Sequence, residues 1–266
     1  KAADIGIAMG SGTQVAKNAG RMILTDDNFA TIVRAVSEGR KLYDNMLKYI
    51  RFMLIALVTY VVTFLGASLL DIAGGQPFSA VQILWINFVI TAPVGVALGL
   101  DKATPGLMKR KPRPRAASIM SPAVIITVGL VGLFMSVAID LLIVFGTRQY
   151  GDVGVASTIG LVGFSLMLVV AAFEARDERA SILHRETFDN SALNITALVE
   201  IGLVFLIARG GVLTSLLGTA DLTQTQWLIG ALPAVVLFIL WELGKAIARR
   251  RRSTARETDQ LAAHEN

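Results

Sequence analysis

The sequence FMLIALVTYVVTFLGASLL occupies residues 52–70 and contains no Asp, Glu, Lys or Arg. A helix needs about 20 mostly apolar residues to cross the hydrocarbon core of a bilayer, and this segment meets that requirement. Apolar residues also recur at helical spacing upstream, and no proline interrupts them before Pro77. The pattern therefore predicts one long helix from about residue 28 to residue 70, with its second half in a membrane.

Further apolar blocks follow this segment along the chain. With it they predict six membrane spans, at residues 50–70, 79–100, 122–146, 156–174, 193–213 and 226–247. The composition agrees, because 54% of the 266 residues are hydrophobic and 17% are charged, whereas a soluble domain is about 25% charged. The chain has no cysteine, which excludes disulfides and thiolate metal sites within it. The predicted fold class is mainly α, a six-helix transmembrane bundle.

Basic residues are concentrated in alternate polar segments and in the tail. They are Lys102, Lys109, Arg110, Lys111, Arg113 and Arg115; Arg176, Arg179 and Arg185; and Lys245, Arg249, Arg250, Arg251 and Arg252. Because cytoplasmic loops carry an excess of Lys and Arg, we expect these segments and both termini to be cytoplasmic. The net charge of +5 is thus interpreted as a topology signal, and nucleic acid is not expected as a partner. The arginine run is interpreted as a solvated membrane anchor, with a lipid-specific or regulatory role as the alternative.

The N-terminal residues have the pattern of a small soluble unit. A short apolar run at residues 5–9 predicts a strand, and Gly10 to Thr13 predict a tight turn after it. Residues 15–19 predict a short helix, and residues 21–24 a second strand. Asp26 and Asp27 are typical of the residues that precede a helix.

Several motifs resemble those of P-type cation-transporting ATPases. The sequences ADIGIAMGSGTQVAK (residues 3–17), DDNFATIV (26–33) and EGR (38–40) resemble the end of the phosphorylation domain of that family. QILWIN (82–87) and ALGL (97–100) resemble the start and the end of its sixth membrane helix, and PGLMKRKP (105–112) resembles the loop that follows. Six spans match the group of calcium, sodium/potassium and proton pumps, and QILWIN is most similar to the calcium and sodium/potassium branch.

The resemblance implies a division of the chain into three parts. Residues 1–40 are expected to be a small α/β remnant of a HAD-like phosphorylation domain with its stalk. Residues 41–250 are expected to form the transmembrane domain, and residues 251–266 a polar cytoplasmic tail, disordered from residue 253. The glycine-rich turn at residues 10–12 is interpreted as structural rather than as a phosphate cradle. We expect an integral membrane protein of the plasma membrane.

The resemblance also implies a function. The expected function is the membrane part of an ATP-driven cation transporter that works through an aspartyl-phosphate and alternating access. ATP and Mg²⁺ would be cofactors of the intact pump, and the lipid bilayer, the remaining N-terminal part of the pump and the transported cation its partners. The phosphorylated Asp-Lys-Thr-Gly motif and the Thr-Gly-Glu motif do not occur in this chain. We therefore expect no catalytic residue in it, no binding of ATP or Mg²⁺ by it alone, and no activity.

Two alternatives to this function stay open at this stage. The chain could be a truncated, non-catalytic membrane fragment with a regulatory role or none. It could also belong to a relative that kept the fold and lost transport.

Neutral oxygen-bearing residues in the first two spans are the candidates for the ion path. They are Thr59, Tyr60, Thr63, Asn87 and Thr91. By the resemblance, Asn87 aligns with a ligand of calcium pumps, with helix packing as the alternative role. The chain departs from the calcium pattern at Leu57, Tyr60, Ile90, Thr91 and Leu168. This departure suits a monovalent or weakly held ion, and Pro93 is expected to break the helix and expose carbonyl groups.

Four acidic residues lie within predicted spans, where an ionisable group is a functional candidate. Glu200 is the deepest and is the candidate for the transport path. Glu174 and Glu242 lie near cytoplasmic ends, where Arg176 or Lys245 could pair with them, and Asp140 lies nearer the outer surface. His184 and His264 have no neighbours at metal-ligand spacing, so the identity of any metal site is unknown.

Overall fold

The computed structural model describes residues 5–104, 106–112, 114, 120–176 and 188–264, with side chains described up to residue 250. The chain divides into two compact units. The first comprises the described residues within 1–45 and 102–115, and the second those within 46–101 and 116–266. Each unit is considered by itself below.

The first unit contains a strand, a helix and a second strand, as the sequence predicts. Strand β1 (Ile7–Met9) pairs in parallel with β2 (Met22–Leu24), and α1 (Gln14–Ala19) connects them. Helix α1 begins where the Thr13 hydroxyl accepts a hydrogen bond from the backbone of Ala16. A sheet of two strands is all that the described residues form, so the structure supports an α/β unit and not a complete phosphorylation-domain sheet. A short helical turn, η3 (Leu107–Lys109), also belongs to this unit.

The glycine-rich turn after β1 is closed by groups of the chain itself. The backbone N–H of Ser11 donates to both carboxylate oxygens of Asp27, at 3.1 and 3.2 Å. The N–H of Gly10 donates to the carbonyl of Leu24 at 2.7 Å. Hydrogen bonds from the Ser11 side chain and backbone lower the pKa of Asp27. These donors already have an acceptor, which favours a structural turn over a phosphate cradle.

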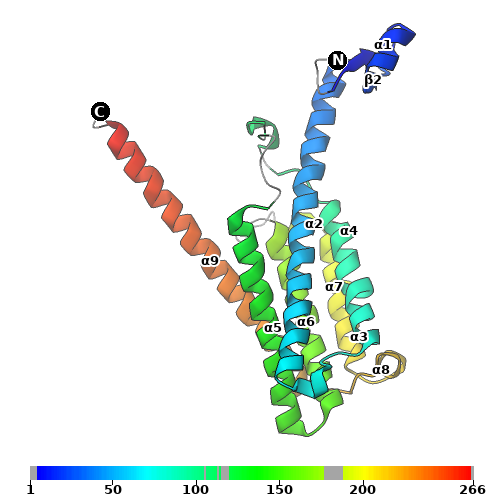
Figure 1. Ribbon diagram of the computed structural model, residues 1–266, viewed down its shortest axis with the longest axis vertical. Helices are drawn as coiled ribbons and strands as arrows, with labels where there is room; N and C mark the ends of the chain where they lie inside the picture. The colour runs from blue at the N-terminus through cyan, green and yellow to red at the C-terminus, as the bar shows by residue number, and fades with distance from the viewer. Residues whose placement is uncertain (1–4, 105, 113, 115–119, 177–187, 265–266) are drawn as a thin grey trace. The chain divides into compact units, whose positions relative to one another are not determined.

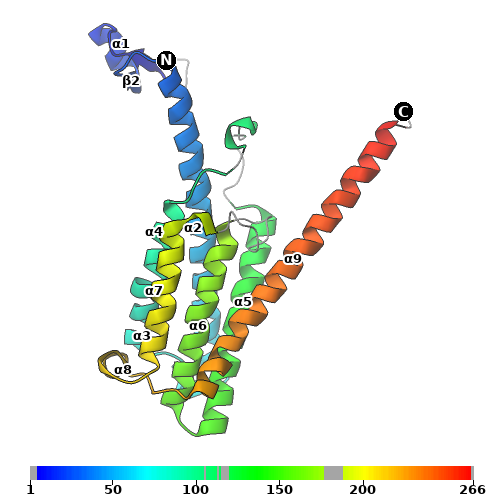
Figure 2. The same cartoon turned by 180° about the vertical axis from the view of Figure 1, so that it is seen from behind.

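The second unit is a helical bundle, drawn in Figures 1 and 2. Its elements are the later part of α2 (Phe29–Leu69), η1 (Ile72–Gly75), α3 (Ala80–Trp85), the π-helix η2 (Ile86–Thr91), α4 (Ala92–Gly99), α5 (Pro122–Tyr150), α6 (Val153–Arg176), α7 (Ser191–Ile207), α8 (Val212–Leu217) and α9 (Gln224–His264). Helix α6 is the most enclosed of them and contacts α5, α7 and α9. The bounds of α2 match the long helix that the sequence predicts.

Five helical stretches within the described residues are long and apolar enough to cross a membrane. They are Phe29–Leu69, Ala80–Gly99, Pro122–Tyr150, Val153–Arg176 and Gln224–Arg250. The remaining predicted span, 193–213, is shorter than expected, because α7 has 17 residues and α8 follows it as a separate helix. Gly210 and Gly211 cause this break, since both have positive φ angles, of 74° and 118°, that a continuing helix does not allow.

The C-terminal tail differs from its prediction. Helix α9 continues to His264, where the sequence analysis expects disorder from residue 253. No glycine or proline follows Gly244, and the tail is rich in Ala and Arg. These residues have high helix propensity, so the helix continues although it has no apolar face to bury.

Glycines allow the helices of the bundle to approach closely. A Cβ atom on Gly146 of α5 would lie 2.8 Å from the Cα of Ala156 in α6. A Cβ atom on Gly163 of α6 would lie 2.9 Å from the carbonyl oxygen of Gly230 in α9. Lipid chains are as apolar as leucine, so membrane helices associate through close packing of this kind.

We predict that Gly146→Ala destabilises the bundle by about 1–3 kcal/mol, because the new methyl group meets backbone atoms that cannot move aside. Gly129→Ala on the same helix is the matched control, since nothing lies within 4 Å of its added Cβ. The control should be neutral or stabilising by up to about 1 kcal/mol. Unfolding of both variants in detergent micelles checks this, and equal effects would contradict the close contact.

Candidate ion path in the membrane bundle

The second predicted span contains a widened helical turn. Between α3 and α4, residues Ile86–Thr91 form a π-helix. The Thr91 hydroxyl donates to the carbonyl of Ile86 at 2.9 Å, and the N–H of Ala92 bonds to the carbonyl of Asn87. Pro93 has no N–H to offer the preceding turn. The helix continues through this segment as a π-helix, a feature frequent at functional sites, and the exposure of carbonyl groups at Pro93 stays a prediction.

Asn87 lies within this widened turn. Its side-chain nitrogen donates to the carbonyl of Ile83 at 3.0 Å. The donating end of the amide is thus occupied by its own helix. The oxygen atom is the part of this side chain that a cation would bind.

The candidates on α2 lie on different sides of that helix. Thr59 is fully buried, and its hydroxyl donates to the carbonyl of Ile55 at 2.8 Å and lies 3.5 Å from that of Gly132 in α5. Tyr60 instead packs edge-on against Phe164 of α6, with ring centroids 5.0 Å apart. Thr59 therefore faces α5, and Tyr60 faces α6. The path candidates of the sequence analysis thus do not form one cluster.

Glu200 is buried in α7, which contacts α4 and α6 (Figure 2). It is 1% exposed, and its carboxylate oxygens have no hydrogen-bond partner among the described residues. At one end of α7, Asn190 donates to the carbonyl of Ala97 at 2.9 Å. Helix α7 begins at this contact and α4 ends near it, so the two helices are antiparallel and both extend from it into the bundle. Glu200 and Asn87, each ten positions away, therefore lie at similar depth, about 15 Å along the bundle.

Ser165 of α6 is a further buried polar residue that the sequence analysis does not select. Its side chain is 0% exposed, and its hydroxyl has no partner among the described residues. The signal in the sequence is a lone hydroxyl in the apolar stretch of residues 159–173. That signal is weak, because most such hydroxyls bond to their own helix, as Thr158 does with the carbonyl of Gly154.

A charged cluster that sequence reasoning misses lies where α4 ends. The Asp101 carboxylate is 1% exposed and receives Lys48 of α2 and Arg176 of α6, each at 2.8 Å. Asn190 adds a hydrogen bond at 3.2 Å while its side-chain oxygen caps α7. Burial acts to raise the pKa of Asp101, but the hydrogen bonds from Arg176 and Lys48 outweigh it and lower that pKa. The signal for this cluster in the sequence was an acidic residue, Asp101, directly after an apolar block.

A second buried ion pair joins α6 to α9. Lys245 Nζ lies 2.6 Å from Glu174 Oε2, with the two side chains 4% and 0% exposed. This is one of the two pairings that the sequence analysis anticipates for Glu174. Arg176, the other predicted partner, bonds to Asp101 instead. His184 lies outside the described residues, as does the side chain of His264.

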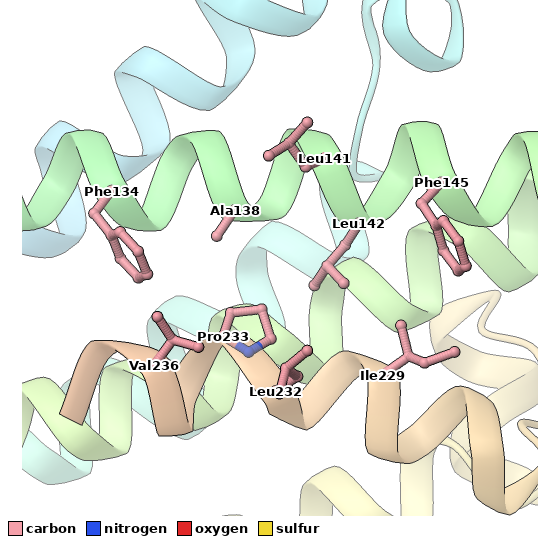
Figure 3. Close-up of a pocket in the computed structure, with 9 residues that line it drawn as sticks. All are labelled: Phe134, Ala138, Leu141, Leu142, Phe145, Ile229, Leu232, Pro233 and Val236. Atoms are coloured by element: carbon pink, nitrogen blue, oxygen red, sulfur yellow. The ribbon is translucent and has the colours of Figure 1, made fainter. Parts of the chain in front are cut away.

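An apolar groove lies between α5 and α9 (Figure 3). Its volume is about 430 Å³, and its lining side chains are Phe134, Ala138, Leu141, Leu142, Phe145, Ile229, Leu232, Pro233 and Val236. None of these side chains carries an oxygen atom. The groove therefore offers no side-chain oxygen ligand to a cation.

These features define the class of protein: a helical integral membrane protein with buried polar side chains and a π-helix inside its bundle. The family model for the C-terminus of cation-transporting ATPases matches residues 75–247. The chain belongs to this family, as its motifs imply.

Curated relatives agree with this assignment. The chain is 34% identical to a calcium-transporting ATPase of Bacillus subtilis over 94% of its own length, and 32% identical to calcium-transporting ATPase 1 of Lactococcus lactis over 93%. It is 37% identical to calcium-transporting ATPase 1 of Schizosaccharomyces pombe over 73%. The matched regions cover 28%, 28% and 22% of these relatives, so the chain spans about a quarter of their length.

We predict that Asp101→Asn destabilises the bundle by about 3–5 kcal/mol at neutral pH, because it leaves Lys48 and Arg176 buried without their anion. Since the folded pKa of Asp101 is lowered, its contribution is present above the unfolded value of about 3.9 and is lost as pH falls through the folded pKa. Unfolding followed from pH 7 to pH 3 should therefore show the variant losing less stability with acid than the wild type.

Asp71→Asn is the control for this measurement, because Asp71 is exposed and makes no capping hydrogen bond. It should leave both the stability and its acid dependence almost unchanged. Equal stability of Asp101→Asn and wild type at pH 7 would contradict the proposed importance of the cluster.

Proposed function

We propose that this chain is the membrane part of an ATP-driven cation pump that works through an aspartyl-phosphate and alternating access. The family match over residues 75–247 is the observation that carries the proposal. ATP and Mg²⁺ would act in the remaining part of a protein of the relatives' length. The alternative of a non-catalytic membrane fragment has no specific feature of the bundle in its favour.

We further propose six membrane passes, with α7 as the shortest. Its 17 residues reach about 26 Å at 1.5 Å per residue, close to the thickness of a hydrocarbon core. Six passes would leave both termini on one side, and the basic segments favour the cytoplasmic side. The plasma membrane is the proposed location. Residues 1–40 would then be the end of the phosphorylation domain, and residues 251–266 a cytoplasmic tail that is helical up to His264.

The proposed ion path centres on Glu200 and the widened turn of the second span. Glu200 would supply the carboxylate that the first two spans lack. Asn87 and Thr91, together with carbonyl groups of the π-helix, would add neutral oxygen ligands, and Tyr60 would line the path from α2. Stripping water from an ion requires compensation of its charge, and one carboxylate suits a monovalent or weakly held ion. The curated relatives are calcium-transporting, so calcium is the first ion to test.

We predict that Glu200→Gln raises the cation concentration for half-maximal phosphoenzyme formation by at least about tenfold, because it removes the buried charge opposite the ion. The measurement uses the full-length protein reconstituted in liposomes, with calcium, sodium and potassium tested separately. Asp71→Asn should match the wild type, since Asp71 is exposed and lies just after α2.

Two results would overturn parts of this proposal. If Glu200→Gln left the cation concentration for half-maximal phosphoenzyme formation unchanged, Glu200 would not be part of the ion path. A full-length wild-type protein that forms no phosphoenzyme with any of the three cations would reject the pump itself and favour the fragment.

A further inference from the structure

Helices α2 and α5 are in direct contact along a polar seam that is not part of the proposed path. Near one end of the seam, a Cβ atom on Gly132 would lie 2.5 Å from the Cγ1 atom of Val58. Further along, a Cβ atom on Gly66 would lie 2.7 Å from the Oδ2 atom of Asp140. Glycine at both positions therefore lets the backbones approach, and at residue 66 it leaves room for a carboxylate.

The spacing of these contacts places two more polar residues on the seam. Thr63 lies four residues after Thr59, which touches α5, and three before Gly66. Ser136 lies midway between Gly132 and Asp140, four residues from each. Residues three or four apart share a helix face. Thr63 and Ser136 thus lie on the contacting faces of the two helices, at the same level of the seam.

Three oxygen atoms of Thr63, Ser136 and Asp140 lack partners among the described residues. Thr63 and Ser136 are 1% and 0% exposed. The hydroxyl oxygens of both, and the Oδ1 atom of Asp140, are buried with no hydrogen-bond partner among the described residues. A buried polar atom without a partner costs about 1–3 kcal/mol, so several of them in one place indicate a ligand.

We propose that Asp140, Thr63 and Ser136 bind a monovalent metal cation between α2 and α5. The ligands are hard oxygen atoms, which suits an alkali cation. One carboxylate in a membrane bundle neutralises one positive charge, so a divalent cation would keep an uncompensated charge. Asp140 itself is only partly buried. This site is separate from the Asn87 and Glu200 region and does not depend on the proposed pump activity.

The test measures the unfolding temperature of the full 266-residue chain in detergent as sodium or potassium chloride replaces choline chloride at constant ionic strength. Wild type should be stabilised by one of the two cations with a saturating dependence, because a ligand that binds only the folded state stabilises it. Asp140→Asn should raise the half-saturating concentration by at least about tenfold. Ser136→Ala and Thr63→Ala should raise it by a smaller factor.

Thr127→Ala is the matched control, because its exposed hydroxyl bonds only to the carbonyl of Ala123 in its own helix. It should keep the wild-type cation response, so a loss there would count against the site. An equal response in wild type and Asp140→Asn would overturn the proposal, and so would a wild type that does not respond to either cation. A response to pH alone, identical in choline, would mean that Asp140 binds a proton and would also overturn it.

Discussion

The buried carboxylate of Asp101 is the constraint on which the bundle depends. A charge that is 1% exposed is tolerated only when its partners are held in place, and here they come from α2, α6 and the start of α7. These contacts fix the end of α4 against three helices. Asn190 of the same cluster also donates a hydrogen bond to the carbonyl of Ala97. This bond sets the register of α7 against α4, and therefore the depth of Glu200.

Close glycine contacts provide the second organising principle. Gly146, Gly163 and Gly230 bring α5, α6 and α9 together without any room for a side chain between them. Polar groups in such a bundle bond to their own helix, as Thr59 does, bond to another helix, as Asn190 does, or stay buried without a partner among the described residues, as Glu200 does. The unpartnered side chains of Thr63, Ser136, Ser165 and Glu200 belong to α2, α5, α6 and α7.

Sequence reasoning found the helices better than the sites. Apolar blocks of sufficient length predicted α2, α5, α6 and most of α9, because in a bilayer the backbone must satisfy its own hydrogen bonds. Sequence reasoning overestimated the length of α7, because Gly210 and Gly211 lie inside an apolar block that a hydropathy pattern treats as continuous. The partners of Asp101, and the helices that Thr59 and Tyr60 contact, were not predictable, because they depend on which helices become neighbours.

The π-helix at Ile86–Thr91 also has a geometric consequence for the two halves of its span. One additional residue in a turn rotates all that follows by about 100° relative to a regular α-helix. The inward faces of α3 and α4 are therefore out of phase with each other. Gln82 on the first half is bonded to the carbonyl of Leu217, and Ala97 on the second half is bonded to Asn190. Both contacts are with the α7–α8 segment, so one span holds the same neighbour at both ends.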